Sequence, residues 1–487
     1  MELQMEIGEV NIGDIQFDMS SRDEIPKLLM GLQAIYEAPE VRDKIFKILL
    51  KIVPKDVNPN RGRKGMDLWK ILVLGTLRLG CNWDYDKLKE IADNHKTLRQ
   101  MLGHSFKDLD YRYPLQTLKD NIALFTQEVL DEINQQIIKL GHKVIGKESD
   151  EPLKGSCDSF PLETNVHFPT DTNLLFDALR KIIVLIVSLC DSLGLTGWRK
   201  SADYLRRVKK ILLRIQRLNN SKPKKPKNIE KKAKLKILLH TAYIALAEYL
   251  IKKAQKTIAS ISSPNIFIQL KIDEIKNYIA HAERQVDQIR RRVIKNEKIP
   301  HKEKVFSIFE EYTEWLSKGK MGVIAELGLN ICIVKDQFGF ILHHIVMQNK
   351  SDVDVAVPII SETIEKFPNF SSCSFDKGFH STDNQTKLAA LLDEVTLPRK
   401  GRLSQPDKEI ENTKEFKEAR KKHPAVESSI NALGKSGLDR CPDHGIDGFK
   451  RYVALGILAR NIQILGNAVQ QQRLNLKTKR KKIRIAA

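Results

Sequence analysis

The sequence predicts an α/β protein in which a mixed sheet, flanked by helices, is interrupted by a large helical insertion and preceded by an all-helical domain. Residues 162–168 and several short segments after residue 328 have the patterns typical of β-strands. Residues 172–318 instead carry the apolar spacing of helices almost throughout. One sheet can accommodate an insertion of this length only if the insertion folds by itself, as a segment of domain size can.

Composition restricts the class of partner. The chain has 487 residues, 41% of them hydrophobic, which is enough for the cores of about two to four domains. Its formal net charge is +21 and its pI is near 9.5. This excess favours a polyanionic partner, and nucleic acid is the first expectation, although a ribosomal or anionic membrane surface would attract the same charge.

The expected location is the cytoplasm, in association with the nucleoid and without a membrane anchor. The chain starts with MELQMEIGEV, which is acidic and unlike a signal peptide. The longest apolar run, Ile182–Val187, is far shorter than the roughly 18 residues of a membrane span. The six cysteines lack Cys-x-x-Cys spacing, which is typical of a reduced protein with buried thiols.

The N-terminal part is predicted to be largely helical. Residues 1–60 mix short strand-like and helical patterns and suggest no role. The apolar residues of Leu68–Leu79 predict a buried helix, Asp84 is a candidate N-cap of the next helix, and Leu115–Leu140 predicts another long helix. Short helices after a basic segment are compatible with a helix-turn-helix module, and a small bundle that only packs is an equal alternative.

The insertion contains the most basic stretch of the chain. Trp198–Lys236 holds sixteen basic residues and two acidic ones, which is too one-sided for a surface of paired charges. We therefore predict contacts with the DNA backbone here. The residues predicted from charge to contact DNA are Arg61, Arg63, Lys64, Arg206, Arg207, Lys209, Lys210, Lys224, Lys225, Arg399 and Lys400.

Three acids stand out by their positions in the predicted sheet domain. Asp158 precedes the first predicted strand, Leu162–Phe168; Asp376 follows the strand Ser371–Phe375; and Glu427 lies on the late helix His423–Leu433. The other predicted elements are a hairpin of Leu329–Val334 and Phe340–Met347 with Gly339 at its turn, helices Val353–Phe367, Thr382–Leu392 and Tyr452–Val469, and a strand Glu394–Pro398.

Carboxylates that converge from separate elements are the ligands of two-metal phosphoryl transfer, because carboxylate oxygens suit hard cations such as Mg²⁺. Pattern alone cannot choose these three among the 61 acids of the chain. Glu163 and Asp171, close to Asp158, are expected to be strand-edge and cap residues. Asp336 is expected in the hairpin turn for local reasons.

A resemblance adds what spacing cannot supply. The chain resembles insertion-sequence transposases of the DDE type, whose catalytic domain is similar to the RNase H fold, and it looks closest to the ISNCY-like group. Four stretches carry the likeness. They are RGRKGMDLWKILVLGTLRLG through MLGH, CDSFPLETNVHFPTDTNLLFDALR, SFDKGFHS, and HPAVESSINALGKSGLDRCPDHGIDGFKRYVALGILARNIQILG.

The resemblance implies that Asp158, Asp376 and Glu427 form the catalytic triad and bind two Mg²⁺ ions, for which Mn²⁺ can substitute. It also implies double-stranded DNA partners, the transposon ends and the target, and a homodimer in the active complex. Where related transposases often carry an arginine before the glutamate, this chain has His423, and Lys435 lies one residue further on than the related lysine. Both are weaker candidates for DNA contact.

Two alternatives stay open at this point. A structure-specific DNA nuclease of the same fold would cut without joining strands. A domesticated transposase would act as a non-catalytic DNA-binding protein. The predicted parts are 1–60, of unassigned role; 61–145, a helical DNA-end-binding domain; 146–171 and 319–470, the two halves of the catalytic domain; 172–318, the basic insertion; and 471–487, a basic tail.

Overall fold

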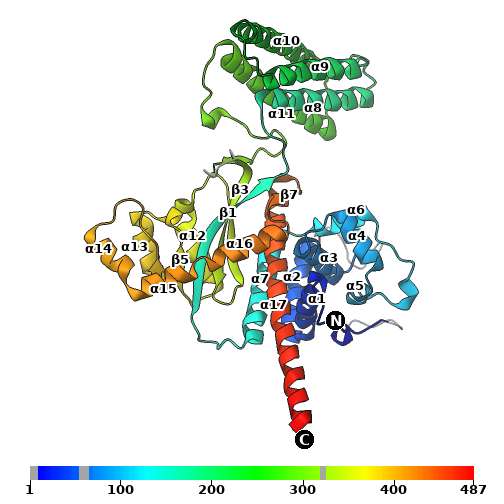
Figure 1. Ribbon diagram of the computed structural model, residues 1–487. Coiled ribbons are helices and arrows are strands. Elements are labelled where there is room, and N and C mark those ends of the chain that lie inside the picture. Colours follow the sequence, from blue (N-terminus) through cyan, green and yellow to red (C-terminus); the bar gives the residue numbers. More distant parts are fainter. Residues whose placement is uncertain (1–8, 54–64, 318–324, 487) are drawn as a thin grey trace. The chain divides into compact units, whose positions relative to one another are not determined.

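The computed structural model describes residues 9–53, 65–317 and 325–486, with side chains up to residue 476 (Figure 1). The chain divides into two compact units. The first combines Met1–Asn165 with Leu316–Ala487, and the second is Val166–Trp315. The helical insertion predicted from the sequence was residues 172–318.

The first unit is a mixed α/β structure, as predicted. In the described residues seven strands form one sheet in the order β2-β3-β1-β5-β6, with β4 paired to β3 and β7 paired to β1. β1 is antiparallel to β3 and parallel to β5, and β5 is parallel to β6. The strands are β1 Leu153–Thr164, β2 Glu314–Leu316, β3 Glu326–Asp336, β4 Ile341–Met347, β5 Phe370–Phe375, β6 Glu394–Thr396 and β7 Arg440–Cys441.

The predicted first strand was wrong in its bounds. The strand is Leu153–Thr164, so Asp158 lies in its middle and not before it, and Val166–Phe168 lie beyond it. Pro161 can lie within the strand because β1 pairs only with β3 around this residue, where a missing N–H is tolerated. Gly155 is required inside the strand, because a Cβ there would lie 2.5 Å from the ring of Phe370.

Helices cover both faces of the sheet. In Figure 1, α15 (Lys414–Lys422) and α16 (Ala425–Lys435) pass in front of the strands, and α12 (Asp352–Lys366) lies behind them. The face toward α12 and α13 (Thr382–Leu391) is apolar. Its buried core includes Cys157, Val334, Ile359, Phe375 and Leu388.

The described part of the N-terminal segment, residues 9–53, is helical and contains none of the strand-like elements expected in part of residues 1–60. α1 (Glu24–Glu37) and α3 (Leu68–Gly80) contact the long C-terminal helix α17 (Gly445–Ala486), as does α7. An apolar window of α17 could span a membrane by length and composition, but 78% of it is buried inside the protein. The remaining helices are α2 Pro39–Leu49, α4 Tyr85–Asn94, α5 Lys96–Met101, α6 Leu115–Ile122, α7 Gln127–Ile145 and α14 Gln405–Asn412.

The single helix predicted for Leu115–Leu140 is in fact α6 and α7. Thr126 caps α7 by accepting a hydrogen bond from the backbone N–H of Val129, and this cap separates the two helices. The apolar pattern continues across the break because Phe125, which lies between α6 and α7 in the sequence, is also buried.

The second unit is a helical bundle. Its core includes Ile182, Val208, Tyr243, Leu250 and Ile275, so every long helix contributes to one apolar cluster. The loop between the second and third of its helices is short, because Pro226 occupies the first position of the third helix. The helices are α8 Asp171–Ser192, α9 Ser201–Asn220, α10 Pro226–Ala259 and α11 Ile266–Ile289.

Candidate active site

The strand register brings two of the predicted acids together. Cys157 of β1 pairs with Phe375 of β5, and this is the last pair of the two parallel strands. Asp158 and Asp376 are the next residues on either strand. Since neighbouring strands lie about 4.8 Å apart, the two aspartates lie side by side at the point where β5 ends.

Both aspartates lie on the face that α15 and α16 cover. Alternate residues of a strand share a face, which groups Asp158 with Ser156 and Asp376 with Ser374. The Oγ atoms of these serines are 3.0 Å apart, and the Ser374 Oγ also lies 3.0 Å from Nδ1 of His423. His423 is buried and caps the C-terminal end of α15. The contacts from Ser156 through Ser374 to His423 therefore hold this end of the helix close to the two aspartates.

Glu427 reaches the same region from the first turn of α16. The helix is attached by buried Val426 and Leu433, and Nζ of Lys335 in β3 donates a 2.6 Å hydrogen bond to the carbonyl oxygen of Ala425. Glu427 itself is exposed, and its charge contributes to raising the pKa of Asp158. Asp376 and Glu427 are thus near enough to Asp158 for their charges to raise its pKa, although among the described residues no three of these carboxylates have oxygens within 4.8 Å of one another.

A fourth carboxylate, Asp352, belongs to this group and was missed in the sequence. It is the first residue of α12, and its Oδ1 accepts a 2.6 Å hydrogen bond from the Ser159 hydroxyl, while Ser159 N–H donates to Oδ1 of Asp158 at 2.8 Å. A Cβ at Gly378, two residues after Asp376, would lie 2.8 Å from the other Asp352 oxygen. The available signal was an acid at the start of a helix beside a capping box.

The charges of the four acids are not balanced by the protein. Burial raises the pKa of Asp158 to about 6, the N–H of Ser159 opposes this shift, and the negative fields of Asp376, Asp352 and Glu427 add to it. Within the described residues none of the four carboxylates forms an ion pair. A site with this composition has both the hard oxygen ligands and the uncompensated charge that suit divalent cations such as Mg²⁺.

A second possible metal cluster lies elsewhere in the same unit. Among the described residues, Asp131, His343 and His344 offer ligand atoms within 4.8 Å of one another. His343 is already engaged on both ring nitrogens, by Glu362 at 2.7 Å and by the Lys366 ammonium at 2.7 Å. A cation would have to displace that ammonium, so the acidic site is the better candidate.

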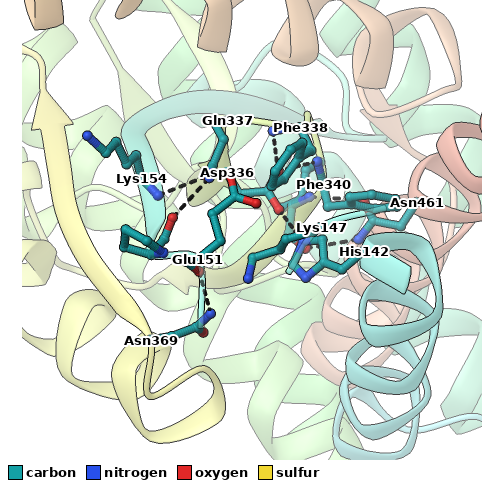
Figure 2. Close-up of polar contacts among 12 residues, drawn as sticks. His142, Lys147, Glu151, Lys154, Asp336, Gln337, Phe338, Phe340, Asn369 and Asn461 are labelled. Atoms are coloured by element: carbon teal, nitrogen blue, oxygen red, sulfur yellow. Dashed lines mark hydrogen bonds and ion pairs between the residues drawn. The ribbon is translucent and has the colours of Figure 1, made fainter. Parts of the chain in front are cut away.

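Asp336 illustrates a buried acid with a local role. It is the last residue of β3, at the hairpin turn. Its Oδ1 accepts hydrogen bonds from the N–H groups of Phe338 and Phe340, both at 2.9 Å, and its Oδ2 lies 2.6 Å from Nε2 of His142 (Figure 2). Glu163 forms an ion pair with Arg440 at 2.8 Å, and Asp171 occupies the first turn of α8. These contacts give all three acids structural roles.

The predicted DNA-contacting residues are distributed over separate regions. Arg61, Arg63 and Lys64 lie outside the described residues. In the second unit the predicted side chains are exposed on α9 or just before α10; they are Arg206, Arg207, Lys209, Lys210, Lys224 and Lys225. In the first unit Lys435 is exposed at the end of α16.

Three other predicted contacts have internal partners. Nε of Arg399 pairs with Asp407 at 3.0 Å, and Nζ of Lys400 donates to the carbonyl oxygen of Gly378 at 2.7 Å. His423 is only 6% exposed and contacts Ser374, so its geometry suits a positioning role better than direct DNA contact.

Comparisons with protein-family models, with curated proteins and with solved structures found no match. The functional argument therefore depends on the geometry and chemistry of the site.

Proposed function

We propose that this protein is a Mg²⁺-dependent DNA transposase of the DDE type, with an RNase H-like catalytic domain. The observation that supports this most directly is the convergence of Asp158, Asp376 and Glu427, which come from two adjacent strands and a helix and are separated by long stretches of sequence. Such an arrangement suits phosphoryl transfer, in which the protein mainly positions the phosphate and stabilises its charge.

The residues divide the work. Two Mg²⁺ ions, for which Mn²⁺ can substitute, would activate a water molecule or the 3′-OH of the DNA and stabilise the negative charge on the leaving oxygen. Asp158 and Asp376 would hold both ions from the sheet, and Glu427 would complete the site from α16. His423 and Ser374 would hold the end of α15 in place over the sheet.

The charge of the chain supports DNA as the substrate. The net charge of +21 and the exposed basic face of α9 suit phosphate contacts, whereas the acidic site needs metal ions before a phosphate can approach. We further propose action on transposon ends and target DNA in the cytoplasm, with two copies of the chain in the working complex, since two ends must be joined.

The decisive experiment is Asp376→Asn in a cleavage assay with Mg²⁺ and a duplex carrying the element's end. We expect cleavage to fall by at least about 10³-fold, because a metal ion supplies several kcal/mol of transition-state stabilisation. Asp383→Asn is the matched control, since Asp383 is exposed on α13 and pairs with Lys387. Undiminished cutting by Asp376→Asn would refute the proposed site.

Transposase and nuclease are then separated by product analysis. A transposase joins the freed 3′-OH to a target plasmid, whereas a nuclease of the same fold leaves only cut ends. Metal-independent DNA binding without cleavage by the unmodified protein would instead indicate a non-catalytic DNA-binding role.

A further inference from the structure

An open cavity of about 510 Å³ lies beside Asp376. It is bounded by the segment after β6, which includes Arg399, and by one side of α15. Lys377, the residue after Asp376, also lines it. This volume lies within the range of about 300–1,000 Å³ that is typical of ligand sites in proteins.

The lining of the cavity is strongly cationic. Five of its side chains are basic, namely Lys377, Arg399, Lys417, Arg420 and Lys421, and one, Glu411, is acidic. Among the described residues Lys377, Lys417 and Lys421 have no ion-pair partner, so their charges are available to a ligand. Uncompensated cations gathered around a cavity favour an anion with several phosphate groups.

The arrangement of α15 concentrates this charge. Phe416, Lys417, Arg420 and Lys421 have the spacing of one helical face and all line the cavity, whereas the acids of the helix, Glu415 and Glu418, do not. Phe416 adds an aromatic surface among the cations. A basic groove with an aromatic side chain is the usual design of sites for single-stranded nucleic acid.

The cavity is also tied to the acidic site. Nη1 of Arg420 donates to the carbonyl oxygen of Phe375, the residue before Asp376, at 3.3 Å, and Nζ of Lys400 donates to Gly378 O at 2.7 Å. The two sites thus share the segment Phe375–Gly378. The cavity and the acidic site are therefore neighbours along this segment.

We propose that this cavity binds an unpaired strand of the DNA substrate next to the phosphate that reacts, with its phosphates on Lys417 and Lys421 and a base against Phe416. The cavity is equivalent to a cube with an edge of about 8 Å, whereas the major groove of a duplex alone is about 12 Å wide. A whole duplex, which is wider than its own major groove, is therefore too large to be enclosed by the cavity. The inference rests on the proposed function and specifies its substrate: DNA that is unpaired beside the cleavage point.

The test measures binding without catalysis. The double variant Lys417→Ala, Lys421→Ala is compared with the unmodified protein for binding of a short fluorescein-labelled oligo(dT) strand, in EDTA and over a series of salt concentrations. We expect about tenfold weaker binding and a salt dependence whose slope is lower by about 1.4, because each lost single-strand phosphate contact removes about 0.7. Binding of a blunt duplex should change little.

The matched control is Lys408→Ala, Lys422→Ala, which removes two exposed lysines of α14 and α15 that do not line the cavity. An equal loss of oligo(dT) binding in the control and cavity variants would overturn the proposal. The remaining basic surfaces are separated from the cavity by photocrosslinking of an iododeoxyuridine strand. We expect the crosslink in the peptide containing Phe416, and crosslinks confined to the helical insertion would contradict the cavity site.

The outcomes are independent of the active-site test. If Asp376→Asn still cleaves, the proposed function fails whatever binds in the cavity. If Asp376→Asn abolishes cleavage but the cavity variants bind and crosslink like the unmodified protein, the acidic site stands and the cavity proposal fails.

Discussion

Two aspartates close to one another in the same strand pair behave differently. In the register of β1 and β3, Asp336 lies opposite Gly155 and Asp158 lies opposite Ile333. Asp336 is 1% exposed, but two backbone N–H groups and His142 surround its carboxylate. Asp158 receives one N–H, from Ser159, and its other charged neighbours are acids.

The difference shows that burial alone does not identify a functional acid. A buried carboxylate whose hydrogen bonds are satisfied stabilises a turn, as Asp336 does. A carboxylate placed among like charges costs stability, and such an arrangement is retained where a ligand supplies the missing positive charge. The sign, as well as the size, of the change in stability on substituting each aspartate can therefore be predicted.

The largest effect on stability is expected for Asp336→Ala. Removing this carboxylate leaves the N–H groups of Phe338 and Phe340 and the ring of His142 without their partner (Figure 2). We expect the free energy of unfolding to fall by about 3–5 kcal/mol, which urea denaturation measures. Mg²⁺-dependent cleavage per folded molecule should be unchanged. A loss below about 1 kcal/mol would show that the turn does not depend on this acid.

A smaller effect, of opposite sign, is expected for Asp158→Asn. The pKa of Asp158 is raised from 3.8 to about 6, so between these values the folded state binds the proton more tightly than the unfolded state. Without metal, stability therefore falls as pH rises through this window, by about 3 kcal/mol. Asp158→Asn cannot ionise and should be more stable than the unmodified protein above pH 6, and equally stable below pH 3.8.

Mg²⁺ provides the control for this prediction. Bound cations supply the missing charge, so adding Mg²⁺ above pH 6 should stabilise the unmodified protein more than Asp158→Asn. Thermal unfolding with and without Mg²⁺ measures both differences. A pH profile identical in the two proteins would mean that solvent already screens the acids.

From the sequence, the strands and helices that carry the site residues could be predicted better than the arrangement of these elements in space. The hairpin was predictable because Gly339 and the alternating strands are local signals, and in the structure its turn has Gly339 at φ 98°. Asp376 was placed correctly at the end of its strand for the same reason. Glu427 could be assigned to a helix, but no local pattern says that this helix lies over the sheet.

Other features depend on contacts that sequence spacing does not contain. The extent of β1 depends on such contacts, because Gly155 is required by the packing of Phe370, and Pro161 lies where β5 no longer pairs with the strand. Asp352 looked like one more acid at a helix start. Only the fold brings it to Ser159, which is distant in sequence.

The smallest effect is expected for Asp352→Asn, and it decides whether the fourth acid belongs to the site. Asp352 contributes to the raised pKa of Asp158 and holds the Ser159 hydroxyl, but its oxygen already accepts a hydrogen bond. We therefore expect cleavage to fall only about tenfold, the size typical of residues that orient metal ligands. Asp354→Asn, two residues along the same helix, is the matched control, because Asp354 only caps the helix through Ser351.

The two variants should separate stability from chemistry. Asp354→Asn weakens a helix cap and should lower stability by about 1 kcal/mol with normal cleavage. Asp352→Asn should lower cleavage and raise the Mg²⁺ concentration that cleavage requires. Adding Ser159→Ala to this variant should lower cleavage little further, because both substitutions remove the same hydrogen bond between Ser159 and Asp352. Additive losses in the double variant would mean that Asp352 acts on the metal site directly, as a ligand equivalent to the other three acids.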